Sequence, residues 1–433
     1  MDKAAKGRAW PALDPTIFAA AMVIYALAMP LGLARVEVAP EVAAGLSLDT
    51  ATATQATPFA LLAARVIQFV PLGDAPFRAN LASAILCAIA VALVGRLCSQ
   101  SIAVLRPPVN ARQEARDFLH EPIAAAGASL ASALALATLD VGSTAGSAAA
   151  TLVVVAAGLL LALALLHETG GSGAGYALSG LAGLSTGVDS VAAPLLWPAL
   201  VGLALWSLRK GARWPLLAPL CFVAGWGGSA LASVASTTAP VSAGWIFSKL
   251  GSVAVRGGPG FSATALELCD ELGVVGGILA GVGVLVLATR ATLVTAWLAL
   301  TLVTSLFLAH SPERTSALLE PTRAALPVAI FVSGVFACAG LVHVSGRLGR
   351  ARMAAALALA VMLVISPAMD GGRSRWLRGS GSPMRLLDRA LARAEIRSVV
   401  FPGTVEMEGL FRLARSIGLR PDLEIGKPVA RRR

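Results

Sequence analysis

Arg78 and Asn80 are the first residues whose types and position suggest chemistry. They lie at the start of a long apolar stretch, a few residues after Asp74. The planar guanidinium of an arginine at a membrane surface matches phosphate geometry, so both residues are candidates for binding a lipid phosphate. An interfacial anchor or an ion pair with Asp74 explains the arginine equally well. Asp74 itself is expected to cap a helix that opens near Ala75, because an aspartate there accepts hydrogen bonds from free backbone amides.

Besides Asp74, three carboxylates lie in the segment before Arg78, and one further candidate carboxylate lies later in the chain. Glu37, Glu41 and Asp49 lie within residues 35–77. A carboxylate there could act as a general base, and the ordinary alternative is a solvated loop residue. Asp189 lies between two short apolar segments. An acidic side chain inside the membrane costs free energy and usually has a function. A turn that exposes Asp189 to water would instead make it an ordinary loop residue.

The remaining polar residues have simple structural interpretations. Glu267, Asp270 and Glu271 precede an apolar stretch and suit a helix N-terminus better than a metal site. His310 and Arg314 follow another apolar stretch and could contact a headgroup or an acceptor, although a solvated loop is the simpler interpretation.

Histidine and cysteine give no metal-binding pattern. The four histidines are distant from one another in the sequence, and the five cysteines form no CxxC pair. No nucleotide-binding loop and no GxSxG elbow stands out. No metal site formed by these side chains and no cofactor is therefore expected, and the sequence leaves open whether the reaction needs a divalent metal.

The composition places these residues in a membrane protein. The 433 residues are 57% hydrophobic and only 14% charged, and the mean hydropathy is +0.77. Soluble proteins have about a quarter charged residues, so the composition excludes a soluble enzyme, and its hydrophobicity excludes a disordered chain. Aromatic residues make up 5%, so most of the apolar mass is Ala, Leu, Val and Gly, which favours closely packed membrane helices. The net charge of +11 is explained by positive inside loops and anionic lipid, and no nucleic-acid partner is expected.

Apolar stretches of about 20 residues predict membrane-spanning helices. These stretches lie near 14–34, 79–97, 123–141, 147–166, 175–188, 190–207, 214–233, 272–289, 292–309, 325–344 and 352–368. The pattern predicts an all-α polytopic membrane protein with about eleven transmembrane helices.

Positive charges predict the orientation. Lysine and arginine gather in alternate loops if the N-terminus, with Lys3, Lys6 and Arg8, is cytoplasmic. An odd number of spans then places the C-terminal tail outside. The tail is rich in arginine, which argues the other way, but long C-terminal segments follow the rule less strictly. The charges thus predict a cytoplasmic N-terminus and an extracytoplasmic tail.

The chain divides into a transmembrane domain, 1–369, and a C-terminal segment, 370–433. The domain has two long outside loops, 35–77 and 234–271. Within the first loop, Pro58–Val70 is too short to span and is expected to lie on the membrane surface, or to form a short re-entrant piece. In the tail, SVVF and LEI on either side of an amphipathic segment predict a small α/β unit.

Three segments resemble a known family. Residues 64–84, ARVIQFVPLGDAPFRANLASA, resemble a segment typified by GRLFSLLPFGDPAFRVNLLSA. Residues 407–425 are similar to the family's RPD-containing tail, and residues 178–199 are similar to its paired short helices. The family is a polytopic membrane family that includes the lumenal O-mannosyltransferase of plexin-type IPT domains and bacterial relatives of unassigned function. It looks like a branch of the GT-C glycosyltransferase superfamily.

This resemblance implies a GT-C-like fold whose first outside loop carries surface-lying helices and an acidic residue. It also implies an enzyme that takes a sugar from a polyprenyl-phosphate donor, and the bacterial inner membrane as the location. Glu41 falls on the family's glutamate, and Glu37 is the nearest substitute for an aspartate that falls on Val38. Accessory roles would fall to Asp49, Asp189, His310 and Arg314.

The chain departs from the family pattern at several polar positions. The His-Pro-Pro-Gly string of the family falls on residues 53–56, which read Ala-Thr-Gln-Ala. An EVY string is not recognisable at 142–160, and the histidine of an Asn-His pair falls near Ser190. These losses favour a catalytically degenerate relative over what the family alone implies.

Three functions fit this sequence. The first is a mannosyltransferase-like membrane glycosyltransferase that acts on an acceptor at the outer face. The second is a catalytically degenerate scaffold that binds lipid or a partner protein. A transporter is the weakest, because apart from Asp189 the predicted spans lack ionisable residues at mid-depth and no internal repeat is evident.

Overall fold

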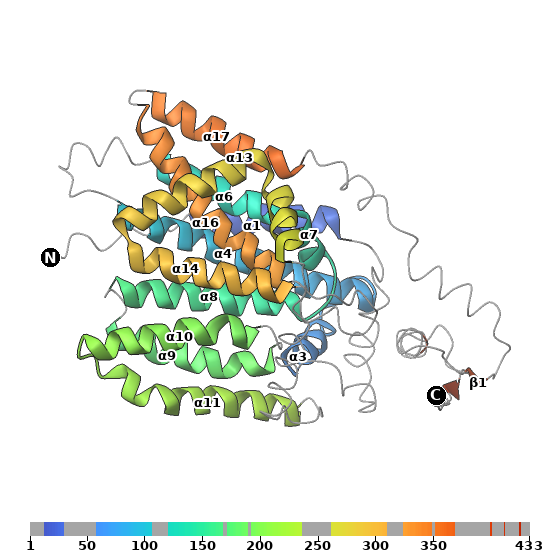
Figure 1. Ribbon diagram of the computed structural model, residues 1–433. Coiled ribbons are helices and arrows are strands. Elements are labelled where there is room, and N and C mark those ends of the chain that lie inside the picture. Colours follow the sequence, from blue (N-terminus) through green and yellow to red (C-terminus); the bar gives the residue numbers. More distant parts are fainter. Residues whose placement is uncertain are drawn as a thin grey trace.

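The computed structural model describes residues 13–29, 58–105, 120–167, 171–188, 192–235, 261–309, 324–348 and 351–368, with short pieces at 399–400, 411 and 424–425. Within these residues the chain is almost entirely α-helical, and its helices pack side by side in a bundle (Figure 1). Lipid favours this architecture, because a helix pairs its backbone polar groups within itself.

Every apolar stretch predicted from the sequence coincides with at least one helix. The helices are α1 (Leu13–Ala28), α3 (Pro58–Ile67), α4 (Ala75–Leu105), α6 (His120–Leu134), α7 (Leu136–Ser143), α8 (Ala148–Leu166), α9 (Gly171–Leu184), the 3₁₀ turn η3 (Ser185–Gly187), α10 (Ala192–Arg209), α11 (Trp214–Ala235), α13 (Phe261–Arg290), α14 (Thr292–Ala309), α16 (Ala325–Gly346) and α17 (Arg352–Ala368). For α14 and α17 the predicted and observed bounds are identical.

Two predicted spans differ from the structure. The continuous helix predicted over 123–141 is wrong, because the chain breaks at Ala135 and α7 turns away from α6 by 71°. The helix predicted over 272–289 begins earlier, at Phe261, and contains a kink at Gly273. Gly273 has a φ of 65°, which suits glycine, and a Cβ there would lie 1.9 Å from the hydroxyl of Ser366 on α17.

Seven helices in the described part of the chain are long and apolar enough to cross a membrane. The bent pair α6–α7 raises the number to eight if it is one span, and α1 and the apolar part of α17 are shorter apolar helices. The chain is therefore a polytopic α-helical membrane protein, while the larger number of about eleven spans stays a prediction.

α16 forms the centre of the bundle. It packs against α4, α6, α13 and α14. Of its apolar 18-residue part, 89% is buried. By contrast, only 17% of the apolar 18-residue part of α11 is buried. Leu216, Leu220 and Leu231 of α11 are exposed. An exposed surface this apolar suits contact with lipid rather than with water.

α13 and α16 approach so closely that only glycine fits at their contact. A Cβ added to Gly283 would lie 1.7 Å from the carbonyl oxygen of Phe336. A Cβ added to Gly340 would lie 2.0 Å from the carbonyl oxygen of Leu279. The contact is reciprocal, because each helix offers a glycine to the backbone of the other.

α9 and α11 use the same arrangement. A Cβ at Gly183 would lie 2.0 Å from the Phe222 carbonyl oxygen, and one at Gly225 would lie 2.0 Å from the Gly180 carbonyl oxygen. These close approaches agree with the small-residue composition.

The two strings expected to be strands in the tail are paired. β1 (Val399–Val400) and β2 (Glu424–Ile425) are parallel, with Val399 opposite Glu424. Phe411, between them in the sequence, is helical. Most of 370–433 lies outside the described residues, so the α/β unit as a whole stays a prediction.

The capping role predicted for Asp74 is confirmed. Its Oδ1 accepts a hydrogen bond of 2.9 Å from the backbone amide of Phe77, and α4 begins at Ala75. Asp74→Ala removes this acceptor at an exposed helix start, so we expect a loss of about 1 kcal/mol in the free energy of unfolding. Thermal denaturation of the purified protein in detergent measures the change. Asp74→Asn keeps an acceptor and should stay near the wild type, and an equal loss in both variants would contradict the capping role.

Candidate functional site at the α3/α7 end of the bundle

α3, α7 and the first turns of α13 lie at one end of the bundle, called here the α3/α7 end (Figure 1). α4 also begins at this end, and the candidate residues Arg78 and Asn80 lie in its first two turns. The two long loops predicted from the sequence, 35–77 and 234–271, extend too far, because α4 begins at Ala75 and α13 begins at Phe261. The α3/α7 end therefore carries the two predicted site residues that the structure describes, Arg78 and Asn80.

Arg78 holds the turn between α3 and α4. Its Nε donates a hydrogen bond of 2.9 Å to Oε1 of Gln68, and its Nη1 donates one of 3.4 Å to the carbonyl oxygen of Val70. The side chain is half-buried. Although the sequence suggested an ion pair between Arg78 and Asp74, the structure has none, and Asp74 caps the helix instead. A guanidinium has five N–H donors, so two bonds leave others for an anion.

The turn that Arg78 holds exposes apolar side chains. Val66, Phe69 and Leu72 are exposed, and Phe69 has 88% of its surface accessible. α3 itself packs on α4 and α11. The helix expected at Pro58–Val70 is confirmed as α3, and an exposed aromatic side chain just before a span suits the membrane interface. The choice between a surface helix and a re-entrant piece stays a prediction.

Asn80 is buried, with 1% of its surface accessible. Its Oδ1 accepts a hydrogen bond of 2.8 Å from the backbone amide of Ala145, just after α7. Asn80 therefore anchors the end of α7 to α4. This contact gives the carboxamide a structural role, and burial keeps it away from a ligand at the surface.

A carboxylate from α13 closes the break between α6 and α7. The amides of Leu136 and Ala137 donate hydrogen bonds of 2.5 Å and 3.1 Å to the two carboxylate oxygens of Glu271. The first amides of a helix have no partner within the helix, and its N-terminus carries partial positive charge. Ala135, which precedes α7, offers no capping side chain. Glu271 therefore takes the place of an N-cap, but from another helix.

Sequence reasoning missed this contact. Glu271 was expected to lie at the start of its own apolar helix, and it does lie just before the kink at Gly273, after which the second piece of α13 runs. Its carboxylate, however, bonds the start of α7. The break itself has no signal in the sequence. Residues 131–137 read Ala-Ser-Ala-Leu-Ala-Leu-Ala, and alanine and leucine are among the strongest helix formers.

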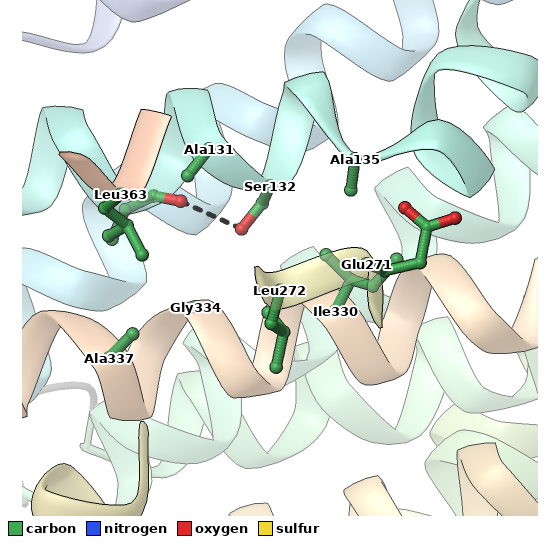
Figure 2. Close-up of a pocket in the computed structure, with 10 residues that line it drawn as sticks. Ala131, Ser132, Ala135, Glu271, Leu272, Ile330, Gly334, Ala337 and Leu363 are labelled. Atoms are coloured by element: carbon green, nitrogen blue, oxygen red, sulfur yellow. Dashed lines mark hydrogen bonds between the residues drawn. The ribbon is translucent and has the colours of Figure 1, made fainter. Parts of the chain in front are cut away.

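A small pocket adjoins the Glu271 contact (Figure 2). It lies between α6, α13, α16 and α17, and its cavity volume of about 10 Å³ has room for a group of about the size of one water molecule. Figure 2 shows the Glu271 carboxylate at one side, and Ser132 donating its hydroxyl to the carbonyl of Ala128, at 2.9 Å. The lining residues are Ala128, Ala131, Ser132, Ala135, Glu271, Leu272, Ile330, Gly334, Ala337 and Leu363. The pocket is far too small for a sugar, because ligand pockets have volumes of roughly 300–1,000 Å³.

The other predicted site residues lie outside the described residues. They are Glu37, Glu41, Asp49, Asp189, His310 and Arg314. The structure therefore places Arg78 and Asn80 at the same end of the bundle and leaves the acidic part of the site as a prediction. Among the side chains that the structure describes, no three His, Cys, Asp or Glu are grouped so as to hold a metal ion.

The fold defines an α-helical polytopic membrane protein in which one predicted span is broken into the helices α6 and α7. No family model, no curated protein and no solved structure matches the chain. The resemblance to the GT-C family therefore depends on the sequence segments alone.

Proposed function

We propose that the protein is a membrane glycosyltransferase that moves a sugar from a polyprenyl-phosphate donor to an acceptor on the outer face of the bacterial inner membrane. One observation carries the proposal. Arg78 lies in the first turn of a membrane span, is held by two hydrogen bonds, and keeps guanidinium donors for an anion. It also lies within the segment 64–84 that resembles the GT-C family. A fixed cation where a loop meets the membrane suits the phosphate of a lipid-linked donor.

The transfer needs a group that activates the acceptor hydroxyl and a group that stabilises the leaving phosphate. Glu41, with Glu37 as its substitute, takes the proton of the acceptor hydroxyl as general base. The acceptor oxygen then bonds to the anomeric carbon, and the bond from that carbon to the phosphate oxygen breaks. The polyprenyl phosphate leaves with its charge stabilised by Arg78. Asp49, Asp189, His310 and Arg314 are accessory candidates for the acceptor or the headgroup.

A catalytically degenerate scaffold that binds lipid or a partner protein is the second candidate. Two observations favour it. Asn80, which was expected beside the donor phosphate, is buried and bonded to Ala145, and Arg78 already holds the α3–α4 turn. The loss of the family's polar strings at residues 53–56 points the same way.

Transfer by purified protein in liposomes separates these two functions. Label from a radioactive polyprenyl-phosphate mannose is followed into membrane-extract acceptors, and polyprenyl-phosphate glucose is tested in parallel. Glu41→Gln and Arg78→Ala are each expected to lower the rate at least about 100-fold, because each removes a group that acts in the transition state. Glu267→Gln, an exposed carboxylate on α13, is the matched control and should retain the wild-type rate.

Gln68→Leu separates the two roles of Arg78. It removes the hydrogen bond that holds the turn but leaves the guanidinium in place. If Arg78 binds phosphate, Gln68→Leu keeps most of the transfer that Arg78→Ala loses. Full transfer by the double variant Glu41→Gln, Glu37→Gln would overturn the catalytic assignment. Donor binding without transfer in the wild type would favour the scaffold.

A further inference from the structure

α7 is held at both of its ends by side chains from other helices. At its start, the Leu136 and Ala137 amides donate to Glu271 of α13. Just beyond its end, the Ala145 amide donates to Asn80 of α4 at 2.8 Å. These contacts join residues that are 135 and 65 positions apart in the sequence. The short helix therefore bridges the first turns of α4 and the first turns of α13.

The path continues from Asn80 to the turn before α4. Asn80 and Arg78 lie two residues apart on α4, so one rigid helical turn connects them. Arg78 then bonds Gln68 at 2.9 Å and Val70 at 3.4 Å. A continuous chain of contacts thus leads from α13, which follows the second long loop, to the turn that ends the first long loop.

α7 is also closely packed along its length. A Cβ at Gly142 would lie 2.5 Å from Cε1 of the buried Tyr25 ring. The Cys87 thiol lies 3.3 Å from the Tyr25 hydroxyl and 3.9 Å from the Thr138 carbonyl, to both of which it can donate. A helix packed this closely moves as a unit and transmits displacement from one end to the other.

We propose that α7 is a strut through which Glu271 positions Arg78. The carboxylate fixes the start of α7, α7 fixes Asn80 through the Ala145 amide, and Asn80 fixes the helical turn that carries Arg78. Loss of the Glu271 contact then loosens the 65–74 turn, although Glu271 is far from it in sequence. This coupling goes beyond the proposed glycosyl transfer and holds for whatever ligand Arg78 meets. If the transfer proposal is correct, Glu271 is a positioning residue for the donor phosphate.

Hydrogen–deuterium exchange of the full-length protein in detergent tests the coupling without any ligand. Glu271→Gln keeps the shape of the side chain but weakens both amide contacts. Peptides from 136–145 and from 65–80 should then exchange at least about fivefold faster than in the wild type, because each step of the path loses roughly one hydrogen bond of protection. Peptides from 214–235 of α11 serve as the internal reference and should be unchanged.

Glu267→Gln is the matched control, one turn earlier on α13 and exposed. It should leave all three regions unchanged. Faster exchange confined to 136–145 would overturn the proposal, because the disturbance would then stop inside α7. Equal acceleration in 214–235 would also overturn it, because the effect would be a general loss of stability.

The reverse experiment keeps the proposal testable if Glu271→Gln fails to fold. Asn80→Ser removes the acceptor for the Ala145 amide. A strut requires faster exchange at residues 136–140, at the far end of α7, as well as around Ala145. Acceleration that stops at Ala145 would show that α7 does not couple its two ends.

Discussion

Gly340→Ala is expected to lower the free energy of unfolding by about 3 kcal/mol, a large part of the roughly 5–15 kcal/mol by which a native protein is stable. The added Cβ would lie 2.0 Å from the Leu279 carbonyl oxygen and 2.9 Å from its carbon. Both atoms belong to the backbone of α13, so the overlap cannot be relieved by turning a side chain. α13 and α16 must instead move apart along their most extensive contact. Thermal denaturation in detergent and the yield of monodisperse protein measure the effect.

Gly281→Ala is the matched control on α13. No atom lies within 4 Å of a Cβ added there, so the substitution makes no overlap. Alanine favours helix over glycine by about 1 kcal/mol, and Gly281→Ala should leave stability unchanged or raise it slightly. Similar losses for Gly281→Ala and Gly340→Ala would show that the helices do not meet at the glycines.

Glu271→Ala is expected to cost about 2–5 kcal/mol in the free energy of unfolding. The substitution leaves the Leu136 and Ala137 amides without their acceptor at a half-buried helix start, and it removes a negative charge from the positive end of α7. Glu271→Gln should cost less, because its amide oxygen can still accept one of the two bonds. Chemical or thermal denaturation of the purified variants measures both changes.

Glu267→Ala tests whether this effect belongs to the contact or to the charge. Glu267 lies one turn before Glu271 on the same helix and is exposed. Its removal should change stability by no more than about 0.5 kcal/mol. If both alanine variants lose stability equally, general electrostatics at the start of α13 and not the capping of α7 is responsible.

The helices were predictable because hydrophobicity alone determines where a chain enters lipid. Between Arg290 and His310 the sequence has no charged residue, and α14 fills that interval. The cap at Asp74 was predictable for a similar reason, since an aspartate at the start of an apolar helix has few other uses.

The break at Ala135 could not be predicted, because its cause lies elsewhere in the sequence. Every residue around it favours a continuous helix, and the carboxylate that stabilises the second piece comes from Glu271. The break also has no glycine or proline beside it, so the residue types that usually mark a broken helix are lacking here.

The candidate site was predictable in position and only partly in role. Arg78 and Asn80 both lie at the α3/α7 end, as residues at the start of one helix must. Their roles differ because Asn80 is buried and Arg78 is only half-buried. The sequence near Asn80 does not reveal its burial, because that burial depends on the turn after α7. Asn80 turns inward to the Ala145 amide, whereas Arg78 remains half-buried at the α3–α4 turn.

The central position of α16 has a consequence for biosynthesis. Among the described helices α16 is the second to last to leave the ribosome, yet α4, α6, α13 and α14 all pack against it. Until residue 346 has been inserted, the faces of these helices that will meet α16 are covered only by lipid. The packing of the membrane domain is therefore completed late in synthesis, when α16 inserts between the earlier helices. A chain that terminates before residue 325 would lack the helix against which α4, α6, α13 and α14 pack.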